Sequence, residues 1–187
     1  MEYQVIYSRR RTLALEIGAK GLLVRAPYGT EASAVERFVE AHRGWIEKHL
    51  AVRNRRAAEQ KEIPPLTREE LTALAEEAAR ILPARVAHYA AQIGVSYGRI
   101  TVRSQRTKWG SCSAKGNLNF NCLLLLAPPQ VLDCIVVHEL CHRKEMNHSP
   151  RFYREVYRVY PAYDQWNRWL KENGFRLLAR LPQKEPE

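Results

Sequence analysis

Three histidines that lie close together in the sequence constrain the fold of this chain most strongly: His138, His142 and His148. The first two are four residues apart, and Glu139 directly follows the first. On an α-helix, positions i and i+4 lie one above the other on the same face, so both imidazoles can reach one metal ion. Glu139 would then lie beside the metal without binding it. This H-E-x-x-H arrangement is typical of zinc hydrolases and requires a helix over the segment.

The third histidine cannot share that helical face, because the six residues from His142 to His148 turn an α-helix by about 600°. Local signals for a turn lie between them. Asn147 tolerates the left-handed backbone that ends helices, and Ser149-Pro150 is typical of the N-cap and first residue of a new helix. We therefore predict that the chain turns at Asn147 and returns His148 to the other two histidines.

Three protein ligands leave a fourth position open for water, as catalytic rather than structural zinc requires. We predict one Zn²⁺ ion held by the three histidines. The alternative is a carboxylate as third ligand, supplied by Glu155 or Asp164 from the helices that follow. Metzincins share the overall spacing but have a glycine where this chain has Glu145, which argues against a true metzincin.

The composition of the 187-residue chain, 45% hydrophobic and 27% charged, indicates a soluble globular protein. No apolar run approaches the ~20 residues of a membrane span. The N-terminus, Met1 to Ile17, lacks the apolar region of a signal peptide, so we expect a cytoplasmic location. The four cysteines form no CxxC pair and are typical of free, mostly buried thiols: Cys112, Cys122, Cys134 and Cys141.

The net charge of +10 is unevenly distributed. Residues 78–132, which precede the metal motif, contain seven basic residues and no acidic ones. If this segment forms a wall of the cleft, it would attract an anionic substrate, with Arg103 and Arg106 as candidate contacts. It could also associate with nucleic acid. The alternative is a solvated basic face that only aids solubility.

Hydrophobic periodicity predicts four parts of the chain: an N-terminal subdomain over 1–56, a linker over 57–66, a catalytic domain over 67–178 and a flexible tail over 179–187. The subdomain is predicted to contain strands over 3–8, 12–17 and 22–26 and a helix over 31–53. Pro64-Pro65 indicates the linker, and Thr67 with Glu70 forms a capping-box signature for the next helix.

The catalytic domain is predicted to mix helices with a few strands. Its first helix, over 68–93, is expected to kink or break at Pro83. Gly174 is expected to end its last helix. The remaining expected elements are strands over 100–102 and 116–126, the metal helix over 129–146, and helices over 150–160 and 162–173. Asn117, Asn119 and Asn121 give the second strand one polar face, as in an ordinary half-buried strand, which the pattern alone favours. The alternative is a strand beside the cleft that pairs with an extended peptide.

Several short motifs surround the metal motif. They are Lys108-Trp109-Gly110-Ser111-Cys112-Ser113, then Gly116 and Asn121, and finally Asn147-His148-Ser149-Pro150-Arg151-Phe152. Together with His138-Glu139-Leu140-Cys141-His142, they resemble the YgjP-like metal-dependent hydrolases, which are described as zincin-like metallopeptidases related at the metal motif to SprT-like proteases. The segments Arg10-Arg11-Thr12, Ala26-Pro27 and Trp45-Ile46 are similar to the family's leading β-hairpin and helix.

The resemblance implies an α+β fold: a zincin-like catalytic domain with an active-site helix and a small sheet, preceded by an N-terminal β-hairpin and helix. It also implies that His138, His142 and His148 bind zinc and that Glu139 is the catalytic carboxylate. Members of the family are called peptidases by motif. Part of the family is also described as a metal-dependent pyrophosphatase that acts on uridine triphosphate.

Three functions follow as hypotheses. The favoured one is a zinc metallopeptidase, in which Glu139 takes a proton from water and passes it to the leaving amine of a peptide or protein substrate. The second is a nucleoside triphosphate pyrophosphatase, with the basic segment holding phosphates. The third is a basic nucleic-acid-binding module with a structural metal. Candidate substrate-binding residues are Arg103, Arg106, Trp109, Ser111 and Asn121.

Overall fold

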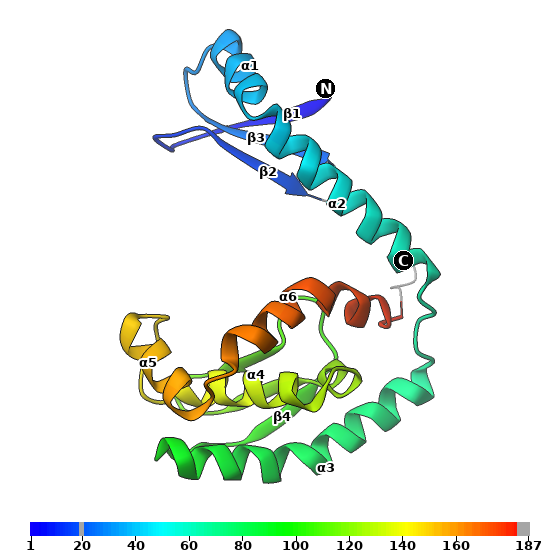
Figure 1. Cartoon of the computed structure of the whole chain (residues 1–187), viewed down its shortest axis with the longest axis vertical. Coiled ribbons are helices and arrows are strands. Elements are labelled where there is room, and N and C mark those ends of the chain that lie inside the picture. The colour runs from blue at the N-terminus through cyan, green and yellow to red at the C-terminus, as the bar shows by residue number, and fades with distance from the viewer. Residues whose placement is uncertain (19–20, 183–187) are drawn as a thin grey trace. The chain divides into compact units, whose positions relative to one another are not determined.

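The computed structural model describes residues 1–18 and 21–182 and divides the chain into two compact units, Met1–Glu59 and Gln60–Glu187 (Figure 1). Each unit has a buried hydrophobic core of its own. Both units combine helices with a small three-stranded sheet. The predicted α+β class is confirmed. None of the helices in the described ranges is long and apolar enough to cross a membrane.

The first unit is built on a sheet with strand order β1-β3-β2, from β1 (Tyr3–Ser8), β2 (Ala14–Gly18) and β3 (Gly21–Pro27). The expected hairpin is formed by β2 and β3, which are antiparallel. Strand β1 pairs in parallel with the other edge of β3. Alternate residues of β3 are buried against α1 (Ala32–Ala41) and α2 (Arg43–Glu62). The single helix expected over 31–53 is therefore two helices, which meet at His42 with φ −112° and ψ 15°.

The linker is shorter than expected, because α2 continues to Glu62 through the first residues assigned to it. Residues 57–62 read Ala-Ala-Glu-Gln-Lys-Glu, all strong helix formers, and the helix ends only where Pro64 prevents its continuation. Leu66, also assigned to the linker, is buried in the core of the second unit, and its N–H donates to the carbonyl of Arg180 at 2.7 Å.

The second unit begins with α3 (Arg68–Ile93), a single unbroken helix with the expected capping box at Thr67 and Glu70. Of the kink or break expected at Pro83, the break does not occur in this described segment. Leu82 and Val86 on either side of the proline are buried in the core, and this packing outweighs the lost backbone hydrogen bond. The helix ends at Gly94, whose φ of 76° is the left-handed conformation that glycine adopts without steric cost.

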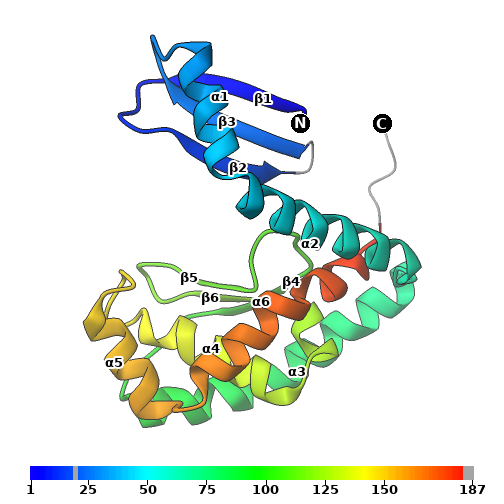
Figure 2. The same cartoon turned by 45° about the horizontal axis from the view of Figure 1, so that its top comes forward.

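The sheet of this unit has the order β4-β6-β5, from β4 (Ile100–Arg103), β5 (Gly110–Cys112) and β6 (Leu118–Asn121) (Figure 2). The central strand β6 is parallel to β4 and antiparallel to β5. The strand expected over 116–126 covers only part of its range, because Cys122–Leu126 forms the 3₁₀ helix η1. A central strand has no free edge, so the alternative of peptide pairing on this strand is wrong, and β6 is the half-buried strand that the pattern favoured.

Three helices complete the unit: α4 (Pro129–Cys141), α5 (Pro150–Val159) and α6 (Tyr163–Ala179). The metal helix α4 is shorter than expected and is buried along almost its whole length. Gly174 does not end α6. A Cβ at this position would lie only 2.8 Å from Cζ2 of Trp109, so the glycine allows Trp109 to pack closely against α6.

The predicted flexible tail over 179–187 is wrong for its first residues. Leu181 is 6% exposed and belongs to the hydrophobic core, and the carbonyls of Leu181 and Pro182 accept hydrogen bonds from Arg106 at 3.4 and 2.5 Å. The sequence did not show these contacts, because their partners lie 75 and 76 residues away. Residues 183–187 of the predicted tail lie outside the described residues.

Candidate metal centre and active-site cleft

The end of α4 and the turn after it bring the three histidines together. His138 lies in the last turn of α4, His142 is its C-cap, and His148 lies in the following turn. One nitrogen from each residue falls in a group whose atoms all lie within 4.8 Å of one another. The Nε2 atoms of His138 and His148 are 3.0 Å apart, close to the spacing that two bonds of ~2.0–2.1 Å to one tetrahedral ion require.

The turn differs in one detail from the expectation. Ser149 is the N-cap of α5, as predicted, and its hydroxyl accepts from the N–H of Phe152 at 3.3 Å. Among the described residues, however, only glycines have positive φ, so Asn147 is not left-handed. Its carbonyl instead accepts from the N–H of Ser149 at 2.8 Å and closes a tight turn.

Neither carboxylate considered as the third ligand belongs to this group of atoms. Glu155 accepts from Lys144 at 2.9 Å and from Arg158 at 3.0 Å, and these two cations hold its pKa below the usual value. Asp164 accepts from the hydroxyl of Tyr157 at 3.1 Å. Both side chains are therefore engaged elsewhere on the surface.

Each histidine of α4 has a hydrogen bond that orients its ring. His138 Nδ1 lies 2.8 Å from the hydroxyl of Tyr163 on α6, and His142 Nδ1 lies 3.1 Å from the carbonyl of Glu145. If Nδ1–H is the donor in both, each Nε2 keeps a lone pair for a metal. The Nε2 atoms of His138 and His148 then face each other as two hydrogen-bond acceptors. A cation between them would remove the repulsion of their lone pairs.

Burial keeps the histidines of α4 in the neutral form that metals bind. It lowers the pKa of His138 to about 3, with further contributions from the charges of His142 and His148. Burial also lowers the pKa of His142, although the hydrogen bond to Glu145 opposes this shift. A set of three imidazole nitrogens suits Zn²⁺ and similar transition metals better than Mg²⁺, which prefers oxygen ligands.

Glu139 lies beside the histidines and is only 6% exposed. Its burial raises the pKa of the carboxyl to about 7, and the positive charge of Lys108 acts in the opposite direction. The backbone of Gly110 approaches it closely, since a Cβ at this glycine would lie 2.6 Å from Glu139 Oε1. Glycine at this position of β5 therefore leaves the space that the carboxylate occupies.

These residues line one cleft, formed by α4, the turn that follows it and strand β5. The described residues that line it are Lys108, Gly110, Ser111, Cys112, His138, Glu139, His142, Met146 and His148. Strand β5 is an edge strand, because its only neighbour in the sheet is β6. The cleft thus combines a group of candidate metal ligands, a buried carboxylate and an unpaired strand edge.

The hydrogen bonds of β5 show which backbone groups point along this edge. The N–H of Asn121 donates to the carbonyl of Trp109, and the N–H of Ser113 donates to the carbonyl of Asn117, at 2.8 and 2.9 Å. Because bonded pairs alternate in an antiparallel ladder, the backbone groups of Gly110 and Cys112 point away from β6. No described strand pairs with them on that side, so they can pair with an added strand.

The five candidate substrate-binding residues do not lie together. Ser111 lines the cleft, and its hydroxyl accepts from the side chain of Asn119 at 3.1 Å. Trp109 packs against Gly174 on the core side. Arg103 and Arg106 are exposed and are not among the described residues that line the cleft.

Asn121 is 1% exposed and has a structural position instead. Its side-chain N–H groups donate to the carbonyls of Gln105 at 2.7 Å and Lys108 at 3.1 Å, and its oxygen accepts from the N–H of Leu123. Sequence reasoning missed Lys108 and Tyr163 as residues of this site. Lys108 was visible as a cation next to the W-G-S-C motif, but no pattern linked Tyr163 to His138.

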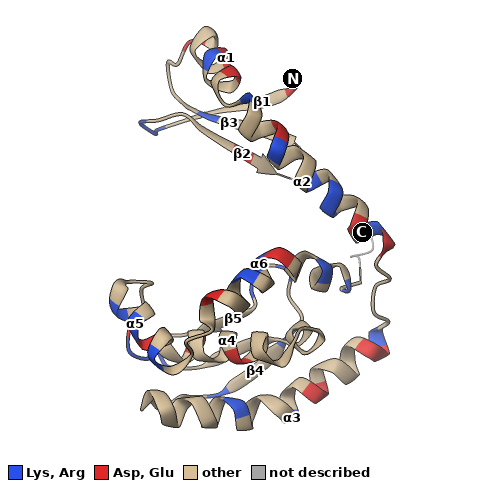
Figure 3. Cartoon of the chain, in the orientation of Figure 1, with Lys and Arg blue, Asp and Glu red and all other residues tan. Residues whose placement is uncertain are grey.

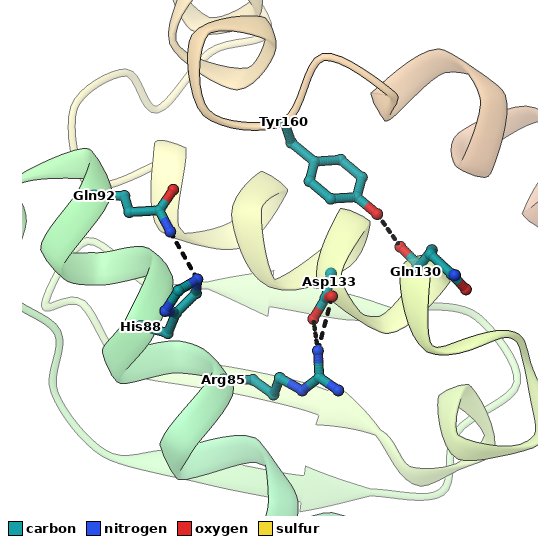
Figure 4. Close-up of polar contacts among 6 residues, drawn as sticks. All are labelled: Arg85, His88, Gln92, Gln130, Asp133 and Tyr160. Carbon is teal, nitrogen blue, oxygen red and sulfur yellow. Dashed lines mark hydrogen bonds and ion pairs between the residues drawn. The ribbon is translucent and has the colours of Figure 1, made fainter.

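The basic segment 78–132 contributes Lys108 and strand β5 to the described lining of the cleft, but its other six basic residues are not part of that lining. Arg85 forms an ion pair with Asp133 at 2.9 Å across α3 and α4 (Figure 4), and Arg80 pairs with Glu77 at 2.6 Å. Helix α3 carries acidic residues in its N-terminal half as well as basic ones (Figure 3). The acidic partners Glu77 and Asp133 lie just outside the segment in sequence. The positive charge around the segment is therefore smaller than its own composition indicates.

A family model described as YgjP-like, metallopeptidase domain, matches residues 11–73 and 65–173. The chain belongs to the YgjP-like family. Membership of this metallopeptidase family makes the chain a metal-dependent hydrolase, as the resemblance of its motifs indicated. A comparison with curated proteins found no match.

Two solved structures of metallopeptidase zymogens are similar to part of the YgjP-like chain. Abylysin of Pyrococcus abyssi is 22% identical with a TM-score of 0.45, and the match covers 49% of this chain and 94% of that one. Jannalysin of Methanocaldococcus jannaschii is 19% identical with a TM-score of 0.44, again over 49% and 94%.

Proposed function

We propose that this YgjP-like chain is a zinc peptidase in which His138, His142 and His148 hold one Zn²⁺ ion and Glu139 is the general base. The observation that carries the proposal is the convergence of three histidine nitrogens within 4.8 Å next to a buried carboxylate. Three protein ligands leave room for water and substrate, whereas a structural zinc site is closed by four.

Bound zinc would supply a Lewis acid that acidifies water and polarises the scissile carbonyl. Glu139 accepts the proton of the attacking water and then donates it to the nitrogen of the leaving amine. The close approach of Gly110 and the burial of the carboxylate hold Glu139 in one position, so it does not need to be ordered at each turnover.

The free edge of β5 supports a peptide substrate. An extended chain can pair with the backbone groups of Gly110 and Cys112, which binds it without regard to most of its side chains. Antiparallel pairing is the more stable arrangement and is the one we assign. Because Gly110 lies against Glu139, we assign the scissile bond to the level of Gly110.

The structure gives less support to the alternatives. A phosphate-binding role for Arg103 and Arg106 requires them at the cleft, and the described lining does not include them. Two arginines of the basic segment, Arg80 and Arg85, are neutralised by acidic partners, which weakens the case for a nucleic-acid surface there. A peptidase is therefore the function that the described cleft supports best.

Hydrolysis by zinc-loaded protein tests the proposal on unfolded casein and a set of nucleoside triphosphates side by side. We expect casein cleavage, and we expect Glu139→Gln to lower its rate by about 10²–10⁴-fold without loss of bound zinc, because only the proton transfer is removed. Triphosphate turnover that is lost in Glu139→Gln, with casein intact, would show that the site performs phosphate chemistry instead.

A further inference from the structure

Lys108 has a distinctive place in the cleft, since it is the one cationic residue among the described residues that line it. It lines the cleft together with Glu139. Within the described ranges, no acidic side chain forms an ion pair with it. The side chain is exposed, and its ammonium is therefore available to a ligand.

The backbone at Lys108 is held more firmly than an exposed loop position requires. Its carbonyl accepts from the buried side chain of Asn121 at 3.1 Å. The next residue, Trp109, accepts from the backbone of Asn121 at 2.8 Å and packs its ring against Gly174 of α6. These contacts fix the point from which the lysine side chain extends into the cleft.

We propose that Lys108 determines specificity by binding a carboxylate on the C-terminal side of the scissile peptide bond. This inference rests on the proposed peptidase function and on antiparallel pairing of the substrate with β5. Lys108 precedes β5, so it lies beyond the strand's N-terminal end. An antiparallel substrate runs from the Cys112 end of β5 towards the Gly110 end. Its residues after the scissile bond therefore lie next to Lys108.

Two kinds of substrate offer this carboxylate. One has Asp or Glu as the first or second residue after the scissile bond, and the other ends there with its free C-terminal carboxylate. A lysine ammonium is a flexible point charge and can meet either group. Because Lys108 is exposed, we expect the contact to contribute about fivefold in kcat/KM.

The test is digestion of a peptide library of defined sequence by zinc-loaded wild-type protein, Lys108→Glu and Lys115→Glu, with products identified by mass spectrometry. The third protein is a matched control, because Lys115 is an exposed lysine in the β5–β6 turn outside the described lining of the cleft. Cleaved sequences are then resynthesised as Asp and Asn pairs, and as free acid and amide pairs, for measurement of kcat/KM.

We expect wild type and Lys115→Glu to prefer the carboxylate member of one pair, and Lys108→Glu to lose that preference and favour Lys or Arg at the same position. The Asp/Asn and acid/amide pairs distinguish the two sources of the carboxylate. Equal cleavage of all pairs by wild type, an acidic preference on the N-terminal side, or an equal effect of Lys115→Glu would overturn the inference alone. No cleavage of any peptide would overturn the proposed function and this inference with it.

Discussion

At the scale of single residues, Tyr163 illustrates how one hydroxyl supports the candidate metal site. It is 3% exposed and lies 2.8 Å from Nδ1 of His138, where it fixes the ring and its tautomer. We predict that Tyr163→Phe lowers zinc affinity by about 10–100-fold, the usual effect of losing such a partner. Competition with a chromogenic chelator measures this affinity.

Tyr157→Phe is the matched control for that experiment, because its hydroxyl bonds the surface residue Asp164. It should leave zinc affinity unchanged. Equal losses of zinc affinity in both variants would contradict a specific role for the hydrogen bond between Tyr163 and His138. They would point to a change in the packing of α5 and α6.

Gly110 gives a second prediction at this scale. A methyl group there would meet three atoms of the Glu139 side chain at 2.6–2.9 Å, so Gly110→Ala must displace the carboxylate. We expect kcat to fall by at least about tenfold, since small misplacements of a catalytic group are costly, while zinc affinity stays near wild type. Gly44→Ala, which meets nothing within 4 Å, is the control and should retain full activity. Unchanged kcat in Gly110→Ala would show that Glu139 tolerates displacement.

At the scale of elements, Arg143 connects the end of the metal helix to the β5–β6 turn. Its guanidinium donates to the carbonyls of Ser96 at 3.0 Å and Ala114 at 3.2 Å, and it packs on Gly116, where a Cβ would lie 2.8 Å from Cζ. The turn leaves no room for a larger residue at Gly116, whose φ of 81° also favours glycine.

We predict that Arg143→Ala lowers the free energy of unfolding by about 1–2 kcal/mol, because two carbonyls lose a charged donor. Faster hydrogen exchange should appear at the amides of residues 110–117, and KM should rise because β5 forms the edge of the cleft. Lys144→Ala, which removes only a surface ion pair to Glu155, is the comparison. Similar exchange rates in the two variants would contradict this role for Arg143.

The elements also show what the sequence can and cannot predict. The capping box at Thr67 and the cap at Ser149 are local signals that predict the observed helix starts, and the histidine spacing predicts the convergence of the three side chains. The unbroken helix at Pro83 and the three-residue strand β5 depend on packing against distant parts of the chain, which no local pattern records. The same is true of the bond between His138 and Tyr163, which are 25 residues apart.

At the scale of the whole molecule, each of the two units has its own buried core. In the first, Ile46 of α2 is 0% exposed and packs with residues of β3 and α1. In the second, Val86 of α3 is also 0% exposed and belongs to the core that supports the candidate metal site. Separate cores favour separate unfolding transitions.

We predict two calorimetric transitions, only one of which zinc raises. Ligand that binds the native state stabilises it by about 2.7 kcal/mol when its free concentration is 100 times Kd, so zinc should shift the transition of residues 60–187 alone. Ile46→Ala should lower the other transition, because truncation of a buried isoleucine costs about 2–5 kcal/mol. Val86→Ala should lower the zinc-sensitive one. A single transition that responds to zinc and to both substitutions would show that the two units unfold together.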